Sequence, residues 1–230
     1  MKSDQRSRTP WTHTERAQWL SEQQVKRSYR DEVVQKIEAL KANYSVTQYH
    51  ALSIDPARYP LYTVQSKKFS AMKKTILITG GVHGYETSGV QGALSYLAGD
   101  GLKDQEEFNL IVAPCISPWA YETINRWNPQ AIDPNRSFKA DSPAEESAQL
   151  MSCMLNDLDG IDCHIDLHET TDTDNTVFRP ALAARDGKEQ PFSPIPDGFY
   201  TVGDTENPQL EFQKAIIESV KKITHIAPAE

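Results

Sequence analysis

Residues 75–89, TILITGGVHGYETSG, decide the predicted fold. The first half is a short apolar, β-branched run that indicates a buried strand, and Gly80 and Gly81 end it. His83 and Glu86 follow three residues apart, so both side chains can reach one cation of the zinc type. HxxE also occurs by chance, and the alternative is an ordinary exposed His and Glu beside a glycine turn.

The order of elements from residue 73 onward indicates an α/β fold, because apolar strands alternate with amphipathic helices. Right-handed crossover connections lay successive strands parallel. We therefore expect a mixed, mostly parallel sheet with helices on both faces. The predicted strands are residues 73–81, 108–116 and 161–167, and the predicted helices are residues 87–97, 142–158 and 209–224.

Residues 1–45 are predicted to form an N-terminal helical extension, and residues 46–230 an α/β domain. Helical spacing of apolar residues predicts one or two helices between residues 15 and 43. Residues 44–64 alternate apolar and polar side chains, which indicates an edge hairpin. The last helix is expected to face the core with Leu210, Phe212, Ile216, Ile217 and Val220.

Composition narrows the class of protein. With 32 acidic against 24 basic residues the formal net charge is −8, which argues against a nucleic-acid partner. The first twenty residues hold no apolar signal-peptide core, and no apolar run approaches the ~20 residues that span a bilayer. Cys115, Cys153 and Cys163 lack CxxC spacing and are expected to be small, reduced, mostly buried side chains. We expect a soluble, cytoplasmic protein without a membrane partner.

Three candidate ligands follow predicted strands. In an open α/β sheet the ligand lies beyond the carboxyl ends of the strands. The turn with His83 and Glu86, the long loop 117–141 and His168 each follow a strand and should converge there. Two imidazoles and one carboxylate with an open position are typical of a catalytic zinc. The sequence therefore predicts one zinc ion held by His83, Glu86 and His168.

Five motifs, taken in order, carry a resemblance to a known family. They resemble the zinc carboxypeptidases of the carboxypeptidase A type and their succinylglutamate desuccinylase/aspartoacylase relatives, over about residues 73–170. The motifs are His83-Gly-Tyr-Glu86, Ser117-Pro-Trp-Ala-Tyr-Glu122, Arg126-Trp-Asn128, Asp133-Pro-Asn-Arg-Ser-Phe138 and Asp166-Leu-His168.

The resemblance implies a zinc hydrolase that cleaves an amide bond next to a free carboxylate. Its substrate would be a peptide, as for a metallocarboxypeptidase, or an N-acyl amino acid, as for a deacylase. Zinc bound by His83, Glu86 and His168 would activate water and polarise the scissile carbonyl. Asp133 would be the carboxylate that orients the His83 ring.

The resemblance also implies roles for three residues of the loop. Asn135 and Arg136 would bind the terminal carboxylate of the substrate, for which a guanidinium fork is well matched. Arg126 would stabilise the oxyanion of the tetrahedral intermediate. The alternative for each is an ordinary structural or surface role.

The sequence departs from the family in one respect. A glutamate on a late strand should act as general base, but the sequence identifies none, and Glu206 is the only loop glutamate considered. Glu169 is expected to point away from His168. We expect a truncated form, and a zinc-binding module with little turnover is the alternative class of function.

The remaining candidates receive structural interpretations. His164 would share a face with His168 on a helix, but strand alternation favours a position ~13 Å away. Asp166 could support a ligand, although a plain sheet hydrogen bond is preferred. The segment ETTDTD, residues 169–174, is interpreted as a solvated or substrate-facing loop rather than a calcium site. His50 is interpreted as an ordinary strand histidine.

Overall fold

A computed structural model describes residues 9–157 and 160–228. The chain divides into two compact units, Trp11–Glu169 and a second one made of Met1–Pro10 with Thr170–Glu230. We call them the main unit and the C-terminal unit and describe each by itself. Every predicted ligand and loop residue, from His83 to His168, lies in the main unit. The division at residue 45 stays a prediction.

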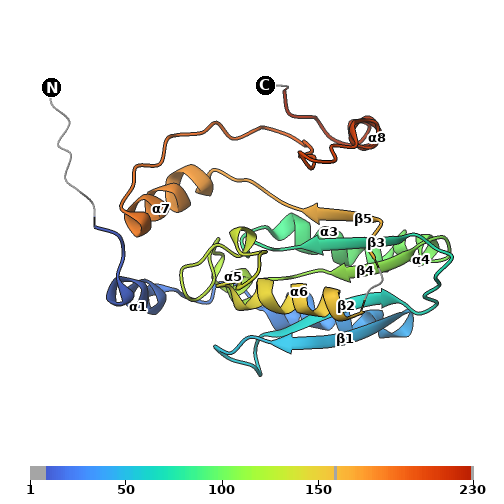
Figure 1. Cartoon of the computed structure of the whole chain (residues 1–230), viewed down its shortest axis with the longest axis horizontal. Helices are drawn as coiled ribbons and strands as arrows, with labels where there is room; N and C mark the ends of the chain where they lie inside the picture. Colours follow the sequence, from blue (N-terminus) through green and yellow to red (C-terminus); the bar gives the residue numbers. More distant parts are fainter. Residues whose placement is uncertain (1–8, 158–159, 229–230) are drawn as a thin grey trace. The chain divides into compact units, whose positions relative to one another are not determined.

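Five strands of the main unit form one sheet in the order β1-β2-β4-β3-β5 (Figure 1). β2 is antiparallel to β1 and β4, whereas β3 is parallel to β4 and β5. Two antiparallel steps restore the direction, so β1 runs in the same sense as β3, β4 and β5. This confirms the predicted mixed, mostly parallel sheet. The strands are β1 (Tyr44–Ala51), β2 (Pro60–Ser66), β3 (Thr75–Gly80), β4 (Asn109–Ala113) and β5 (Cys163–Leu167).

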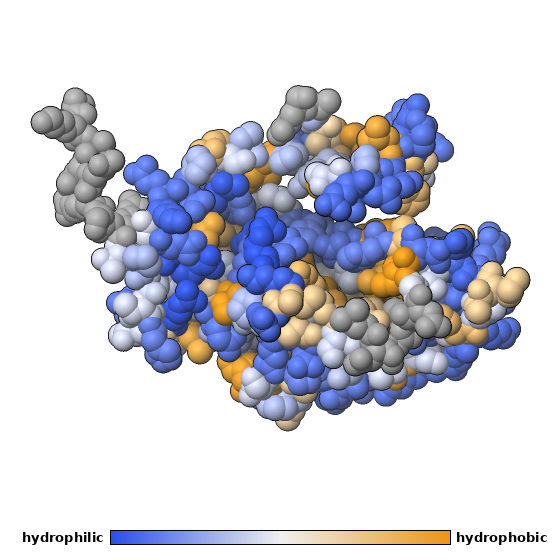
Figure 2. Space-filling model, in the orientation of Figure 1, coloured by the Kyte–Doolittle hydropathy of each residue, from blue (hydrophilic) through white to orange (hydrophobic). Residues whose placement is uncertain are grey.

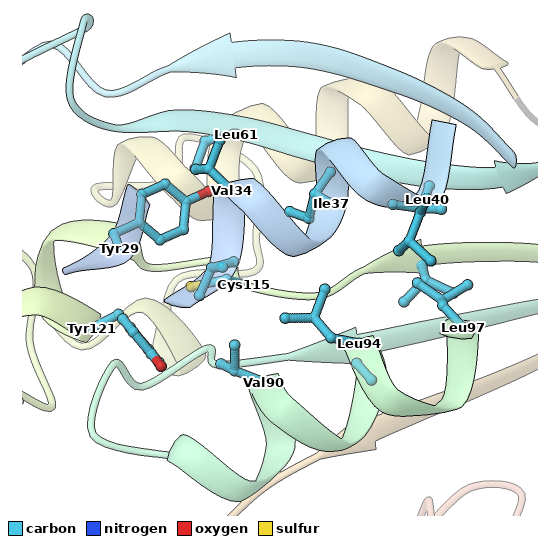
Figure 3. Packing of buried hydrophobic residues seen from close by; sticks show 14 of the residues in the cluster. Tyr29, Val34, Ile37, Leu40, Leu61, Val90, Leu94, Leu97, Cys115 and Tyr121 are labelled. Atoms are coloured by element: carbon cyan, nitrogen blue, oxygen red, sulfur yellow. The ribbon is translucent and has the colours of Figure 1, made fainter. Parts of the chain in front are cut away.

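The sheet is covered on both faces. On one face a continuous helical segment, made of η1 (Arg30–Val34), α2 (Gln35–Ala39) and η2 (Leu40–Ala42), packs with α3 (Thr87–Ala98). Their side chains, such as Ile37 and Leu94, point toward each other in the larger core (Figure 3). On the other face Leu150 of α6 (Glu145–Asp157) packs against Ala113 and Ile116. Figure 1 shows α6 in front of the strands and α3 behind them.

A tryptophan cluster joins the N-terminal helix α1 (His13–Glu22) to the long loop after β4. The ring of Trp19 lies 5.7 Å from that of Trp127 and 6.0 Å from that of Trp119, and Trp11 lies 6.1 Å from Trp127. These four are all the tryptophans of the chain. Helix α1 is thereby packed against the segment that carries Arg126.

The long segments predicted as loops contain short helices. Loop 117–141 holds α5 (Pro118–Thr123) and a 3₁₀ turn, η3 (Pro134–Arg136), and α4 (Gly101–Asp104) lies in the connection before β4. Helix α6 begins at Glu145, three residues later than the predicted start at residue 142, and its predicted end at residue 158 lies outside the described residues. In the C-terminal unit, η4 (Asp174–Phe178) and α7 (Arg179–Asp186) occupy a predicted loop.

The prediction that α8 (Leu210–Val220) faces a core is wrong. None of its side chains is buried, and Leu210 and Phe212 are 70% and 48% exposed. Hydrophobic residues, coloured orange, are visible at the surface over α8 in Figure 2. Periodicity showed which face is apolar but not whether another element covers it. None of the described helices is both long enough and apolar enough to cross a bilayer.

Candidate metal centre

The turn between β3 and α3 presents the first two candidate ligands. Gly81 adopts φ +61°, a conformation that disfavours residues with a Cβ, and turns the chain away from the sheet. His83 and Glu86 are 1% and 0% exposed, and His83 Nδ1 lies 2.8 Å from Glu86 Oε1. The backbone N–H of His83 donates to Glu86 Oε2 over 3.3 Å. Both side chains are therefore fixed inside the turn.

The third candidate ligand arrives from the neighbouring strand. Parallel pairing places Thr79 beside Asp166 and Gly80 beside Leu167, so the next residue, His168, reaches the turn. Its Nε2 lies 3.7 Å from Glu86 Oε1. One ligand atom from each of His83, Glu86 and His168 lies within 4.8 Å of the others. The structure thus brings together the three residues that the sequence proposed.

A carboxylate lies behind each imidazole. His83 Nε2 is 3.0 Å from Asp133 Oδ1, and His168 Nδ1 contacts Asp166, which also accepts from the Thr79 hydroxyl. Each ring therefore turns its other nitrogen toward Glu86. The sequence favoured a plain sheet hydrogen bond for Asp166, but its side chain also contacts the candidate ligand His168. This contact is possible because residues 166 and 168 share a strand face.

The donor set fits a metal ion. A neutral imidazole has one N–H, and if His83 gives it to Asp133, its Nδ1 lone pair faces the Glu86 carboxylate. Two electron-rich atoms 2.8 Å apart need a proton or a cation between them. Glu86 is fully buried, so a bare negative charge there would be costly. Two imidazoles and a carboxylate are ligands typical of zinc.

The electrostatics keep both supporting carboxylates ionised. Burial raises the pKa of Asp133. The hydrogen bond from His83 and the charges of Arg126 and Arg136 lower this pKa by more than burial raises it, so it lies well below its usual range. For Asp166 burial likewise raises the pKa, whereas the contacts with His168 and Thr79 bring it below the usual value. An ionised carboxylate holds the N–H of an imidazole and fixes its tautomer.

The three loop residues take different positions. Arg126 Nε donates to Asp133 Oδ2 over 3.2 Å, so its guanidinium lies beside the cluster. Asn135 Nδ2 lies 3.2 Å from His168 Nε2, the same nitrogen that faces Glu86. An ion at this nitrogen therefore requires the Asn135 side chain to rotate away. Arg136 is exposed on the 3₁₀ turn η3. Their roles toward a substrate stay predictions.

Glu169 and Tyr85 connect β5 to α3, and the sequence did not predict this connection. The Glu169 carboxylate accepts from the backbone N–H and the hydroxyl of Ser88, at 3.0 and 2.8 Å. The Tyr85 hydroxyl donates to the Glu169 carbonyl over 3.0 Å. These bonds hold the end of β5, and with it His168, against the start of α3.

The other candidates lie outside the cluster. His164 Nε2 contacts the Thr79 hydroxyl at 2.9 Å, and His50 Nε2 lies 3.0 Å from Glu145. In the acidic segment Asp174 is paired with Arg179 at 2.9 Å. Glu206 belongs to the C-terminal unit. None of the three cysteines, all of which lie in the described part of the chain, forms a disulfide, and Cys115 is buried.

Residues 72–191, just over half of the chain, match the model of the succinylglutamate desuccinylase/aspartoacylase catalytic domain. This chain belongs to that family. The match confirms the resemblance that the five motifs carry. A search of curated proteins found no match.

Several solved structures share this fold at low sequence identity. A proposed metallopeptidase from Shewanella amazonensis is 21% identical, with a TM-score of 0.63 over 88% of this chain and 69% of that one. One from Shewanella denitrificans is 19% identical, with a TM-score of 0.51 over 72% and 66% of the two chains. A proposed carboxypeptidase from Burkholderia mallei is 17% identical, with a TM-score of 0.57 over 82% and 46%. This chain thus spans from about half to about two thirds of these proteins.

Proposed function

We propose that this protein is a zinc-dependent hydrolase that cleaves an amide bond next to a free carboxylate. The observation that carries the proposal is the arrangement of His83, Glu86 and His168, with a carboxylate behind each imidazole. A zinc ion in such a site activates water and polarises a carbonyl. Membership of the desuccinylase/aspartoacylase family supports the reaction class.

Five residues around the three candidate ligands are proposed to have further roles in the reaction. Asp133 orients the ring of His83, and Asp166 orients the ring of His168. In each ring the other nitrogen then faces Glu86. Arg126 brings a fixed positive charge to the edge of the cluster, where it can stabilise a developing oxyanion. Asn135 and Arg136 are proposed to bind the carboxylate of the substrate, Asn135 after it leaves His168.

Two substrate classes are proposed. Carboxyl-terminal peptides follow from the carboxypeptidase-like motifs, and N-acyl amino acids are favoured by the family whose model matches residues 72–191. Both carry an amide next to a free carboxylate, so the same loop residues would serve either.

The experiment measures metal content and hydrolysis of both substrate classes, with and without a chelator. Wild-type protein should bind one zinc ion, and His83→Ala should lower zinc affinity by more than the ~10- to 100-fold typical of outer contacts. His50→Ala, on β1 and outside the cluster, is the control. Equal rates for wild type and His83→Ala would contradict the proposal. Zinc binding without any hydrolysis would instead indicate a binding module.

A further inference from the structure

Arg27, which lies between α1 and η1, reaches the turn that holds His83 and Glu86. Its Nη2 donates to the Gly84 carbonyl over 2.6 Å and its Nη1 to the Thr87 hydroxyl over 2.5 Å. Its Nε donates to the Tyr121 carbonyl over 2.6 Å. We call residues 81–87 the ligand turn. One guanidinium therefore joins Gly84, in the middle of this turn, and Thr87, at its end, to helix α5.

The guanidinium is itself held in place. Its Cζ lies 3.5 Å from the centroid of the Tyr121 ring, a cation–π contact. The backbone N–H groups of Lys26 and Arg27 donate to the Glu122 carbonyl over 2.8 and 3.3 Å. The buried Glu122 carboxylate accepts from the Tyr29 N–H over 2.9 Å. Arg27 is thus anchored to α5 through its backbone as well as its side chain.

The turn has little room to move on its other side. A Cβ added at Gly84 would lie 1.9 Å from the Ala120 carbonyl carbon, so the turn rests directly on α5. The Tyr85 N–H donates to the Asn125 carbonyl over 3.1 Å. Gly84 lies between the two ligands in sequence, and the direction of its carbonyl sets the backbone path from one to the other.

We propose that Arg27 is a positioning residue for the metal centre. Its planar fork fixes the Gly84 carbonyl and the Thr87 hydroxyl together, and with them the spacing of the His83 and Glu86 side chains. This inference rests on the proposed function. It makes the segment before β1, which carries none of the family motifs, part of the metal site.

Arg27→Lys tests the role, because lysine keeps the charge but cannot make the same planar set of bonds. Zinc affinity is measured by chelator competition, and ligand geometry by the visible absorption of the cobalt-substituted protein. We expect zinc to bind ~10- to 100-fold more weakly and the cobalt bands to change. Arg58→Lys is the matched control, since Arg58 also binds α5, through Glu122 at 2.6 Å, and within the described part of the chain it makes no hydrogen bond or ion pair with the ligand turn. It should change affinity by less than about twofold.

Thr87→Val is the second variant, which keeps the β-branched shape and removes one acceptor of Arg27. It should weaken zinc binding by ~2- to 10-fold. Unchanged zinc affinity in both Arg27→Lys and Thr87→Val would overturn the role of Arg27. So would a loss of zinc affinity in Arg58→Lys equal to that in Arg27→Lys. A wild-type protein that binds neither zinc nor cobalt would overturn the proposed function and this role with it. Tight wild-type binding with unaffected variants would overturn only the role.

Discussion

Glu146 and Glu145 are neighbouring carboxylates on α6 with opposite surroundings. Glu146 is 2% exposed, and burial raises its pKa to about 7, with one hydrogen bond from Asn128 Nδ2 over 3.3 Å. For Glu145 partial burial raises the pKa, but bonds from His50 and Ser53 lower it below the usual value. The pair therefore provides a variant and its control on adjacent positions.

Glu146→Gln should stabilise the protein at alkaline pH. Between pH 4.5 and about 7 the folded state keeps a proton that the unfolded state releases, so wild-type stability falls as the pH rises through this window. A shift of this size corresponds to at most about 3 kcal/mol. We expect the variant to gain up to that amount at pH 8 and little at pH 4, by urea denaturation.

Glu145→Gln should behave in the opposite way. The lowered pKa of Glu145 contributes stability above its unfolded pKa, and that contribution is lost as the pH falls. The variant should therefore be less stable than wild type at pH 8, and the difference should shrink as the pH falls below the unfolded pKa. A Glu146→Gln effect that does not depend on pH would contradict the assigned burial.

Individual site residues could be predicted as far as their chemistry was local. His83 and Glu86 lie three residues apart on one turn, and His168 directly follows a strand, so residue type and spacing located all three. The contact of Asn135 with His168 could not be predicted, because it depends on the path of a long loop and on the side-chain conformation of Asn135. Arg27 lies 57 residues before Gly84 and in none of the motifs, so only the folded chain reveals their contact.

At the scale of elements, helix α3 packs closely against β5, the strand that leads to His168. Gly89 lies on the face toward β5, and a Cβ there would be 2.3 Å from the Leu167 carbonyl oxygen. Gly92, one turn later, is exposed, and a Cβ there would meet no atom within 4 Å. The close approach of α3 to β5 brings His168 to the turn.

Gly89→Ala and Gly92→Ala should therefore have opposite effects on unfolding. In Gly89→Ala the added methyl group pushes the backbone of β5 away from α3, which should lower the free energy of unfolding by about 1–3 kcal/mol. The second replaces an exposed helical glycine and should stabilise by about 0.5–1 kcal/mol. Chemical denaturation measures both, and zinc affinity should fall only in Gly89→Ala. Two variants with the same sign would contradict the packing of α3 on β5.

Elements were predictable where the apolar pattern was strong. The buried strands β3 and β4 and helix α3 agree with their predicted positions within a few residues. The short helices α5 and α7 were not predicted, since helices of this length are marginal by themselves and depend on tertiary contacts. For α8 the amphipathic pattern was right and the inferred burial was wrong, because a pattern in one segment does not specify its partner.

At the scale of the whole molecule, the two units should differ in their resistance to proteolysis. Lys188 is exposed and follows α7, at the start of a stretch that holds no helix or named strand among the described residues up to α8. We expect trypsin to cut first near Lys188, because irregular exposed segments are the preferred sites of nicking. Mass spectrometry identifies the cut, and Lys188→Gln should slow it.

The fragment left by this cut should keep its zinc affinity, since His83, Glu86, Asp133, Asp166 and His168 all lie in the main unit. Early cleavage inside residues 30–42 or α3 would contradict the division into units. Loss of zinc binding after a single cut at Lys188 would show that the C-terminal unit contributes to the site.

The three candidate ligands follow strands that differ in their position in the sheet. His83 and Glu86 follow β3, an interior strand paired on both sides, whereas His168 follows β5, which is at an edge of the five-stranded sheet. Edge strands open more readily than central ones. A bound ion would then lose His168 first and remain for a moment on two ligands. Its residence time should then shorten as β5 and the Glu169–Ser88 bonds detach more often, so we expect the opening of the sheet's edge to set the rate of metal release.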